Sequence, residues 1–182
     1  MKKKIIVSPS GQLQYITDLV DNKILISEIV ISSDCDYVDL TGLDSDVDGG
    51  YILEVAIINN ATSDTGYYLY VNGDTTNSNY RVQYIAAAGG SLFVNRYDKP
   101  MLNYVAPNSV VSLSINIQCI NEHFRYITIT NASATADQDI CAGLWVGKKH
   151  STITKIISLR ISADQTNGIG ANSRFILKRI RG

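Results

Sequence analysis

The sequence is poor in the residues that most often carry out catalysis or bind metals. It contains two histidines, one tryptophan and three cysteines among 182 residues. Cys35, Cys119 and Cys141 lie far apart and match no zinc-binding or redox spacing, so we expect thiols and a chain that folds in a reducing compartment. His123 and His150 have no second ligand at metal-binding spacing, and there is no nucleophile elbow or phosphate-binding glycine motif. The sequence therefore predicts no catalytic residue, no metal site and no cofactor.

Long apolar runs and a large excess of one charge are also missing. The apolar run Ile5–Val7 after the N-terminal lysines is shorter than the roughly 7–15 residues of a secretory signal. No stretch approaches the roughly 18 apolar residues of a membrane span. The formal net charge is −1, so no overall basic field attracts nucleic acid. We expect a protein that folds inside a cell and binds neither nucleic acid nor membranes.

What the chain does contain is a repeated alternation of apolar and polar residues. Along Ser112–Ile120, the side chains of Leu113, Ile115 and Ile117 would point to one face of a strand, and the intervening polar side chains would point to the other. The same pattern recurs along most of the chain, and no long helical stripe is present. The alternation therefore indicates strands with one dry and one wet face.

Turn-forming clusters of Gly, Asn, Asp and Ser separate the predicted strands. The strands are expected at Ile24–Ile31, Tyr37–Leu40, Tyr51–Ile58, Tyr67–Val71, Asn79–Ala86, Ser91–Val94, Val110–Ile120, Phe124–Thr130, Ile140–Val146, Thr154–Ser162 and Arg174–Ile180. A tight hairpin is expected at Asn121-Glu122. This arrangement predicts an all-β fold, an antiparallel β-sandwich of jelly-roll type. Residues 1–20 are predicted to form an N-terminal arm or anchor, and residues 21–182 a single domain.

A cluster of aspartates lies in the glycine-rich segment Asp44–Gly50. The pattern Asp44-x-Asp46-x-Asp48-Gly49 resembles the opening of a calcium loop, but position 12 of such a loop would be Val55 and the following segment is strand-like. A cation bound more loosely by this loop stays open as an interpretation, and paired carboxylates of this kind also serve glycosidases on β-sandwiches. A further interpretation is that these short acidic side chains only cap the backbone and form its turns.

Tyrosine is the abundant aromatic residue, with eleven tyrosines against three phenylalanines. If Leu69 faces the core, Tyr68 and Tyr70 face outward, and Arg81 and Gln83 share the outward side of the next strand. These four residues are the candidate contacts of an interface or a glycan. Because tyrosine has an apolar ring and a polar tip, structural packing, a subunit interface and a glycan site all remain open.

Several segments resemble small jelly-roll proteins of tailed bacteriophage virions. The resemblance is carried by Asp48–Val55, by Asn59-Asn60, by Tyr67–Asp74 with Asn79-Tyr80, and by the ending Ile169–Ile180. In that ending a glycine-containing turn leads into a strand of apolar and basic residues.

The resemblance implies a non-enzymatic virion component that is synthesised in the host cytoplasm. Such proteins serve as auxiliary or decoration proteins on the capsid surface, as head fibres, or as tail and baseplate parts. They contact other capsid or tail subunits and often form homo-oligomers, commonly trimers. The N-terminal arm would be the anchor that adds a strand to a neighbour, with the candidate residues Lys2, Lys3, Lys4, Ile5, Ile6 and Val7. A carbohydrate-binding β-sandwich is the alternative function, and a glycan is a possible ligand.

Overall fold

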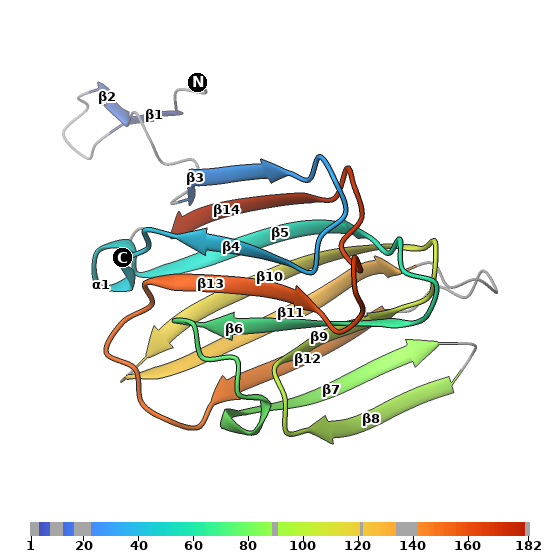
Figure 1. Ribbon diagram of the computed structural model, residues 1–182. Helices are drawn as coiled ribbons and strands as arrows, with labels where there is room; N and C mark the ends of the chain where they lie inside the picture. The colour runs from blue at the N-terminus through green and yellow to red at the C-terminus, as the bar shows by residue number, and fades with distance from the viewer. Residues whose placement is uncertain are drawn as a thin grey trace.

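The computed structural model describes residues 4–7, 13–16, 23–88, 91–120, 122–133 and 142–180. Most of these residues belong to two antiparallel sheets that pack face to face, with the four-stranded sheet over one side of the eight-stranded sheet (Figure 1). The prediction of an all-β antiparallel sandwich is therefore confirmed. None of the described helices is long and apolar enough to cross a membrane.

The large sheet contains strands that are far apart in the sequence. In spatial order it consists of β3 (Lys23–Val30), β14 (Arg174–Ile180), β5 (Gly50–Ile58), β10 (Val110–Ile120), β11 (His123–Ser133), β12 (Ala142–Lys149), β7 (Tyr80–Ala88) and β8 (Ser91–Tyr97). The edge strands are β3 and β8. Non-consecutive strands therefore lie side by side, which brings together residues that are far apart in sequence.

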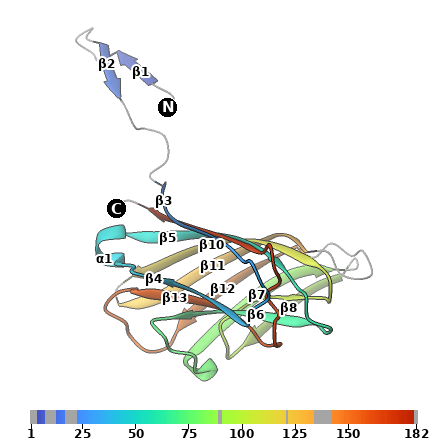
Figure 2. The ribbon, with the colours of Figure 1, turned by 45° about the horizontal axis from the view of Figure 1, so that its top comes forward.

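The small sheet has the order β4 (Tyr37–Thr41), β13 (Ser158–Ala163), β6 (Thr65–Val71) and β9 (Met101–Val105). Two short helices connect strands: α1 (Ser45–Asp48) precedes β5, and the 3-10 turn η1 (Asn77–Asn79) precedes β7. Figure 2 shows β4, β13 and β6 over the strands of the large sheet from a second direction. Strands β1 (Lys4–Val7) and β2 (Leu13–Ile16) pair with each other in a two-stranded sheet.

The alternating residues of β10 face the core as predicted. Leu113, Ile115 and Ile117 are buried, and the residues between them point to the outer face of the large sheet. The opposing layer contributes Leu159 and Ile161 of β13. Burial of such aliphatic side chains, at about 25 cal/mol per Å² of apolar surface, is the main force that holds the two sheets together.

The predicted hairpin between β10 and β11 is also confirmed. The two strands pair antiparallel, with Ile120 opposite His123. Glu122 has a φ of 61°, the left-handed conformation that a tight turn of this kind requires. The bounds of β10 and β14 match the predicted strands.

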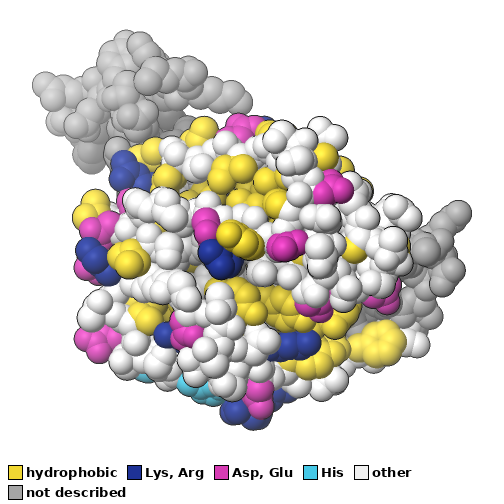
Figure 3. All heavy atoms as spheres, in the orientation of Figure 1, with side chains coloured by type: hydrophobic (Ala, Val, Ile, Leu, Met, Phe, Trp, Pro, Cys, Tyr) yellow, Lys and Arg dark blue, Asp and Glu magenta, His cyan; other side chains and the backbone are white. Residues whose placement is uncertain are grey.

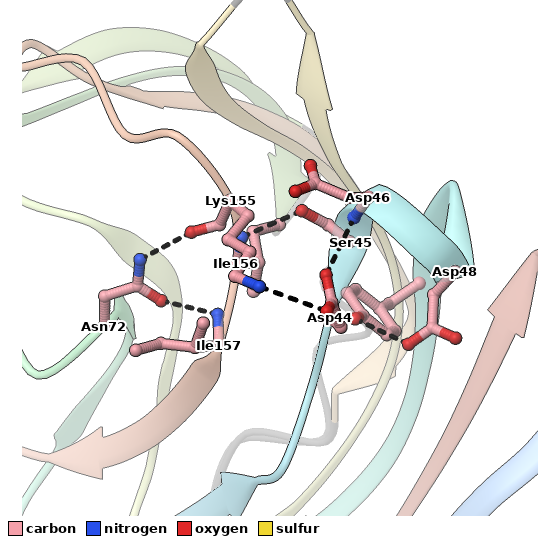
Figure 4. Close-up of polar contacts among 9 residues, drawn as sticks. Asp44, Ser45, Asp46, Asp48, Asn72, Lys155, Ile156 and Ile157 are labelled. Carbon is pink, nitrogen blue, oxygen red and sulfur yellow. Dashed lines mark hydrogen bonds and ion pairs between the residues drawn. The ribbon is translucent and has the colours of Figure 1, made fainter.

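The structure corrects several strand predictions. Strands β8 and β12 end at Tyr97 and Lys149, each three residues beyond the predicted end. The strand predicted from Thr154 begins only at Ser158, because the backbone before it bonds to side chains of α1 and of the turn after β6. The N–H groups of Ile156 and Ile157 donate to Ser45 Oγ and Asn72 Oδ1, both at 2.8 Å (Figure 4). Strand β9 was not predicted, because side chains on both of its faces are buried and the sequence therefore shows no alternation.

Candidate binding surface

Tyr68 and Tyr70 do not form an exposed platform, which corrects the prediction that both rings are available at the surface. They do point away from the core side of β6, but only 6% and 7% of their surfaces are exposed. The hydroxyl of Tyr68 donates to Asp164 Oδ2 at 3.0 Å and accepts from Lys99 Nζ at 3.2 Å. The hydroxyl of Tyr70 donates to Asn77 Oδ1 at 2.7 Å. Loops thus cover both rings, and structural packing is the interpretation that the structure supports.

The outer face of the small sheet carries charges of both signs. Acidic and basic side chains are interspersed over it in the space-filling view (Figure 3). Arg160 of β13 binds Asp39 of β4 through two hydrogen bonds of 2.7 Å, and its guanidinium lies 4.0 Å from the ring centroid of Tyr37. Arg160 is the one cation within the four described strands of this sheet, and Asp39 neutralises it.

The structure places Arg81 and Gln83 on the other sheet, separate from the two tyrosines. Both lie on β7 and face outward, with Gln83 exposed and Arg81 half-buried. The four candidate residues therefore do not form one site. The outer face around Arg81 and Gln83 is instead shared with β8, β12, β11 and β10, and the role of these two residues as ligand contacts stays a prediction.

A row of basic side chains crosses this outer face. Register places Arg125 directly opposite Lys148, and Lys148 directly opposite Arg81. Directly opposite residues of an antiparallel pair have Cβ atoms about 4.5–5.5 Å apart, and like charges in such positions are destabilising. Arg81 is neutralised by Asp98, whose Oδ1 lies 2.8 Å from Arg81 Nε. That bond is the main reason why the pKa of Asp98 is lowered.

The other two cations of the row have no such partner. Within the described part of the chain, Arg125 and Lys148 form no ion pair, and both side chains are exposed. Arg96 on β8 adds a further exposed cation next to Gln83, its register partner. The arrangement therefore concentrates positive charge in a chain whose formal net charge is −1.

These side chains line a hollow of about 610 Å³ on the outer face. Its lining includes the amides Gln83, Asn116 and Gln118 in addition to the basic residues, and no aspartate or glutamate. Ile127 and Val146, which face each other across β11 and β12, contribute apolar surface. A volume of this size lies in the range of small-molecule sites, about 300–1,000 Å³.

The neighbouring part of the same face is apolar, and we call it the apolar half. It is made of exposed aliphatic side chains that follow one another across four strands, namely Val94, Ile85, Leu144 and Ile129. A second hollow of about 640 Å³ lies here and is lined in part by Ile85, Val94 and Leu144. The outer face between β8 and β11 thus has an apolar half and a cationic half, the latter made of Arg81, Arg96, Arg125 and Lys148. The cation lies two residues from the apolar row on β8 and four residues from it on β7, β11 and β12.

Two aspartates of the Asp44–Gly50 segment, Asp44 and Asp48, bond through their carboxylates to groups of the protein. Asp44 is the N-cap of α1, where its Oδ1 accepts from the Asp46 N–H at 3.2 Å, and its Oδ2 lies 3.1 Å from Lys155 Nζ (Figure 4). These contacts agree with the interpretation that the acidic residues cap and turn the chain. Among the residues that the structure describes, no group of three or more His, Cys, Asp or Glu could hold a metal ion.

Asp48 is buried and bonds to two partners. The hydroxyl of Tyr51 donates to its Oδ2 at 2.8 Å, and Arg179 Nη1 donates to its Oδ1 at 3.0 Å. Burial opposes ionisation of Asp48, but the bonds from Arg179 and Tyr51 outweigh it and hold the pKa of the carboxyl below its usual value. Asp48 therefore joins α1 to β5 and to the last strand, β14.

The remaining candidates concern the arm and the cysteines. Lys2 and Lys3 lie outside the described residues, whereas Lys4, Ile5, Ile6 and Val7 form β1, whose described partner is β2. Their role as an anchor stays a prediction. Cys35 and Cys119 are free, half-buried thiols, and burial is the main cause that raises the pKa of each. Cys141 lies outside the described residues.

Sequence reasoning missed most of the residues in the cationic half. Lys148, Arg125 and Arg96 were not grouped with Arg81, because the pairing of β12 with both β11 and β7 cannot be read from local alternation. The available signal was that each of these residues occupies an outward position of its own strand. The strand order was the missing information.

No protein-family model and no curated protein matches this chain. Among solved structures, it is similar to a fructofuranosidase from Schwanniomyces occidentalis, with a TM-score of 0.27 and 10% identity over 98% of this chain. The chain spans only 38% of the length of that enzyme. It is also similar to peanut lectin, with a TM-score of 0.25 and 7% identity over 97% of this chain and 89% of the lectin. At these TM-scores neither likeness supports a conclusion about function.

Proposed function

We propose that this chain is a non-enzymatic structural protein that assembles with further copies of itself through strand β8 and the apolar half. The observation that carries the proposal is the exposure of this edge. Leu92 and Val94 of β8 are each 71% exposed, and Phe93, which points to the opposite side of the strand, is 49% exposed. Long apolar edge strands with unpaired backbone groups are templates for pairing with another chain, and contiguous exposed apolar patches mark interfaces.

A second copy of the chain is an occupant compatible with the sequence of β8. Antiparallel pairing of two β8 strands about a two-fold axis at Val94 would place Leu92 opposite Arg96, so no two cations would face each other. The pairing would extend the large sheet across both copies. It would also bring the two apolar halves next to each other.

The proposed setting of this assembly is a bacteriophage particle, as an auxiliary protein on the capsid surface. Support for the setting comes from the sequence resemblance to jelly-roll virion proteins, and the confirmed β-sandwich is compatible with it. A carbohydrate-binding module, or a tail or baseplate component that contacts a host surface, is the second candidate. The observation that favours this second function is the hollow of about 610 Å³ lined by Arg81, Arg96, Arg125 and Lys148, which we call the cationic hollow.

Light scattering coupled to size-exclusion chromatography tests the assembly. The full chain is expected to be oligomeric, and Ile85→Glu or Leu144→Glu to shift it to the monomer, because each variant places a charge within the apolar half. The matched control is Val47→Glu on α1, a position that is 72% exposed and remote from β8, and it is expected to leave the oligomer intact. A monomeric wild-type chain at all concentrations would overturn the proposal. Imaging of intact particles then tests the virion setting.

A further inference from the structure

We infer that the cationic hollow binds an acidic saccharide, a sugar that carries a carboxylate or a sulfate group. The inference rests on the second candidate function and names its ligand class. Its two central cations, Arg125 and Lys148, lie on β11 and β12 and do not line the hollow of the apolar half, so they can be tested separately from the assembly through β8.

The charge arrangement calls for an anion. Arg125 and Lys148 face each other on adjacent strands, and within the described part of the chain neither has an ion-pair partner. Two other cations on the outer face of the same sheet are paired: Arg81 with Asp98, and Lys178, whose Nζ lies 2.7 Å from Glu54 Oε2. An anionic group placed between Arg125 and Lys148 would relieve their mutual repulsion and accept charge-assisted hydrogen bonds from both.

The amides distinguish a saccharide from a simple anion. Arginine and lysine only donate hydrogen bonds, whereas Gln83, Asn116 and Gln118 each provide both an NH₂ donor and a carbonyl acceptor. A sulfate ion at neutral pH carries no proton and therefore cannot donate a hydrogen bond to an acceptor. The hydroxyl groups of a sugar need both kinds of partner, and Gln118 stands directly opposite Arg125, where one ligand could reach both.

The apolar floor and the size of the hollow fit a sugar ring rather than a nucleotide base. Ile127 and Val146 are exposed between the amides and can contact the C–H face of a ring. The only aromatic residue of the lining, Tyr126, is buried and cannot stack on a base. The volume of about 610 Å³ accommodates one or two sugar units.

Isothermal titration of the full chain tests the inference with four probes: digalacturonate, a sulfated galactose disaccharide, the neutral galactose disaccharide and sodium sulfate. We expect saturable binding of at least one acidic sugar, at least tenfold tighter than the neutral sugar and the sulfate ion, and weakened by added NaCl. Binding of the neutral sugar as tightly would overturn the acidic class while leaving carbohydrate binding intact. If the sulfate ion binds as tightly as the acidic sugars, the hollow is a site for an oxyanion only, and the inference of a saccharide ligand is overturned.

Variants locate the ligand. Arg125→Gln or Lys148→Gln is expected to reduce the affinity for the acidic sugar by tenfold or more, and Asn116→Ala to reduce it for the sugar but not for sulfate. The matched control, Lys178→Gln, removes a paired cation of the same face and is expected to bind normally.

Circular dichroism confirms that each variant is folded, and the salt dependence of the wild-type chain provides an independent measurement. Unchanged binding in folded Arg125→Gln and Lys148→Gln, or no binding of either acidic sugar by the wild type, would overturn the inference. The oligomeric state of each variant is measured in parallel by light scattering, so that a loss of sugar binding can be distinguished from a loss of assembly through β8.

Discussion

The ring of Tyr126 lies against Gly147 on the neighbouring strand and fills the space that a Cβ atom at position 147 would need. Tyr126 is directly opposite Gly147 in the register of β11 and β12, and its hydroxyl donates to the carbonyl of Met101 on β9 at 3.2 Å. One side chain thus joins the two sheets. It can do so because its partner has no side chain.

Gly147→Ala is therefore expected to destabilise the protein by about 1–3 kcal/mol, the usual effect of overpacking a core. Urea unfolding followed by circular dichroism measures the loss. Gly143→Ala on the same strand is the control, because its Cβ would meet its nearest neighbours at 3.2 Å, and a smaller loss is expected. Equal stability of Gly147→Ala and the wild type would contradict the packing described for Tyr126.

Tyr68→Ala is expected to lower the free energy of unfolding by about 3 kcal/mol or more, because it empties a buried aromatic position. Tyr68→Phe removes only the bonds to Asp164 and Lys99, so a smaller loss of about 1–3 kcal/mol is expected. Both are measured by chemical denaturation. Binding of acidic sugars should persist in folded Tyr68→Phe. Loss of that binding with unchanged stability would restore Tyr68 as a ligand contact.

The stability of the protein should fall in acid partly because of Asp48. The pKa of this carboxyl is lower in the folded chain than its ordinary value, so its stabilising effect is present above that ordinary value and is lost as the pH falls through the lowered one. Asp48→Asn is expected to give a shallower decrease of stability below about pH 5. Thermal unfolding over a pH series measures the slope. Asp46→Asn, an exposed position on the same helix, is the control, and equal slopes for Asp48→Asn and the wild type would refute the assignment.

Thr128→Val is expected to leave stability unchanged or to raise it by about 1 kcal/mol. The Thr128 hydroxyl is buried between the sheets and has no hydrogen-bond partner within the described residues. The control is Thr65→Val, because the Thr65 hydroxyl bonds to Asn59 Oδ1 at 3.0 Å and that variant should be destabilised. Chemical denaturation compares the two. A marked loss of stability in Thr128→Val would indicate a partner for this hydroxyl.

Deletion of residues 1–20 is expected to leave a folded β-sandwich that still self-associates through β8 but no longer enters the particle. The reason is the proposed role of the arm as an anchor that adds a strand to a neighbouring subunit. Circular dichroism, light scattering and analysis of purified particles measure the three properties. Normal incorporation of the shortened chain would rule out the anchor.

Local alternation identified most of the strands but not the exposure of their outer faces. For Tyr68, alternation correctly placed the ring away from the core side of β6, yet it could not show that Asp164 and Lys99, distant in sequence, would cover it. Strand β9 was not recognised for a related reason. Its successive residues Met101 and Leu102 point to opposite faces and are both buried, so the two faces do not differ in polarity. Burial from both sides removes the signal on which sequence reasoning depends.

The local sequence is sufficient to establish that this chain forms amphipathic strands joined by tight turns, because the period of two is a local property of the extended backbone. Which strands are neighbours depends on the folded core as a whole. Arg81, Arg125 and Lys148 occupy outward positions that the sequence reveals one strand at a time, and they meet because β12 pairs with β11 on one side and β7 on the other. Strand order and register arise from packing of the whole core, so a binding surface assembled across strands appears only in the folded chain.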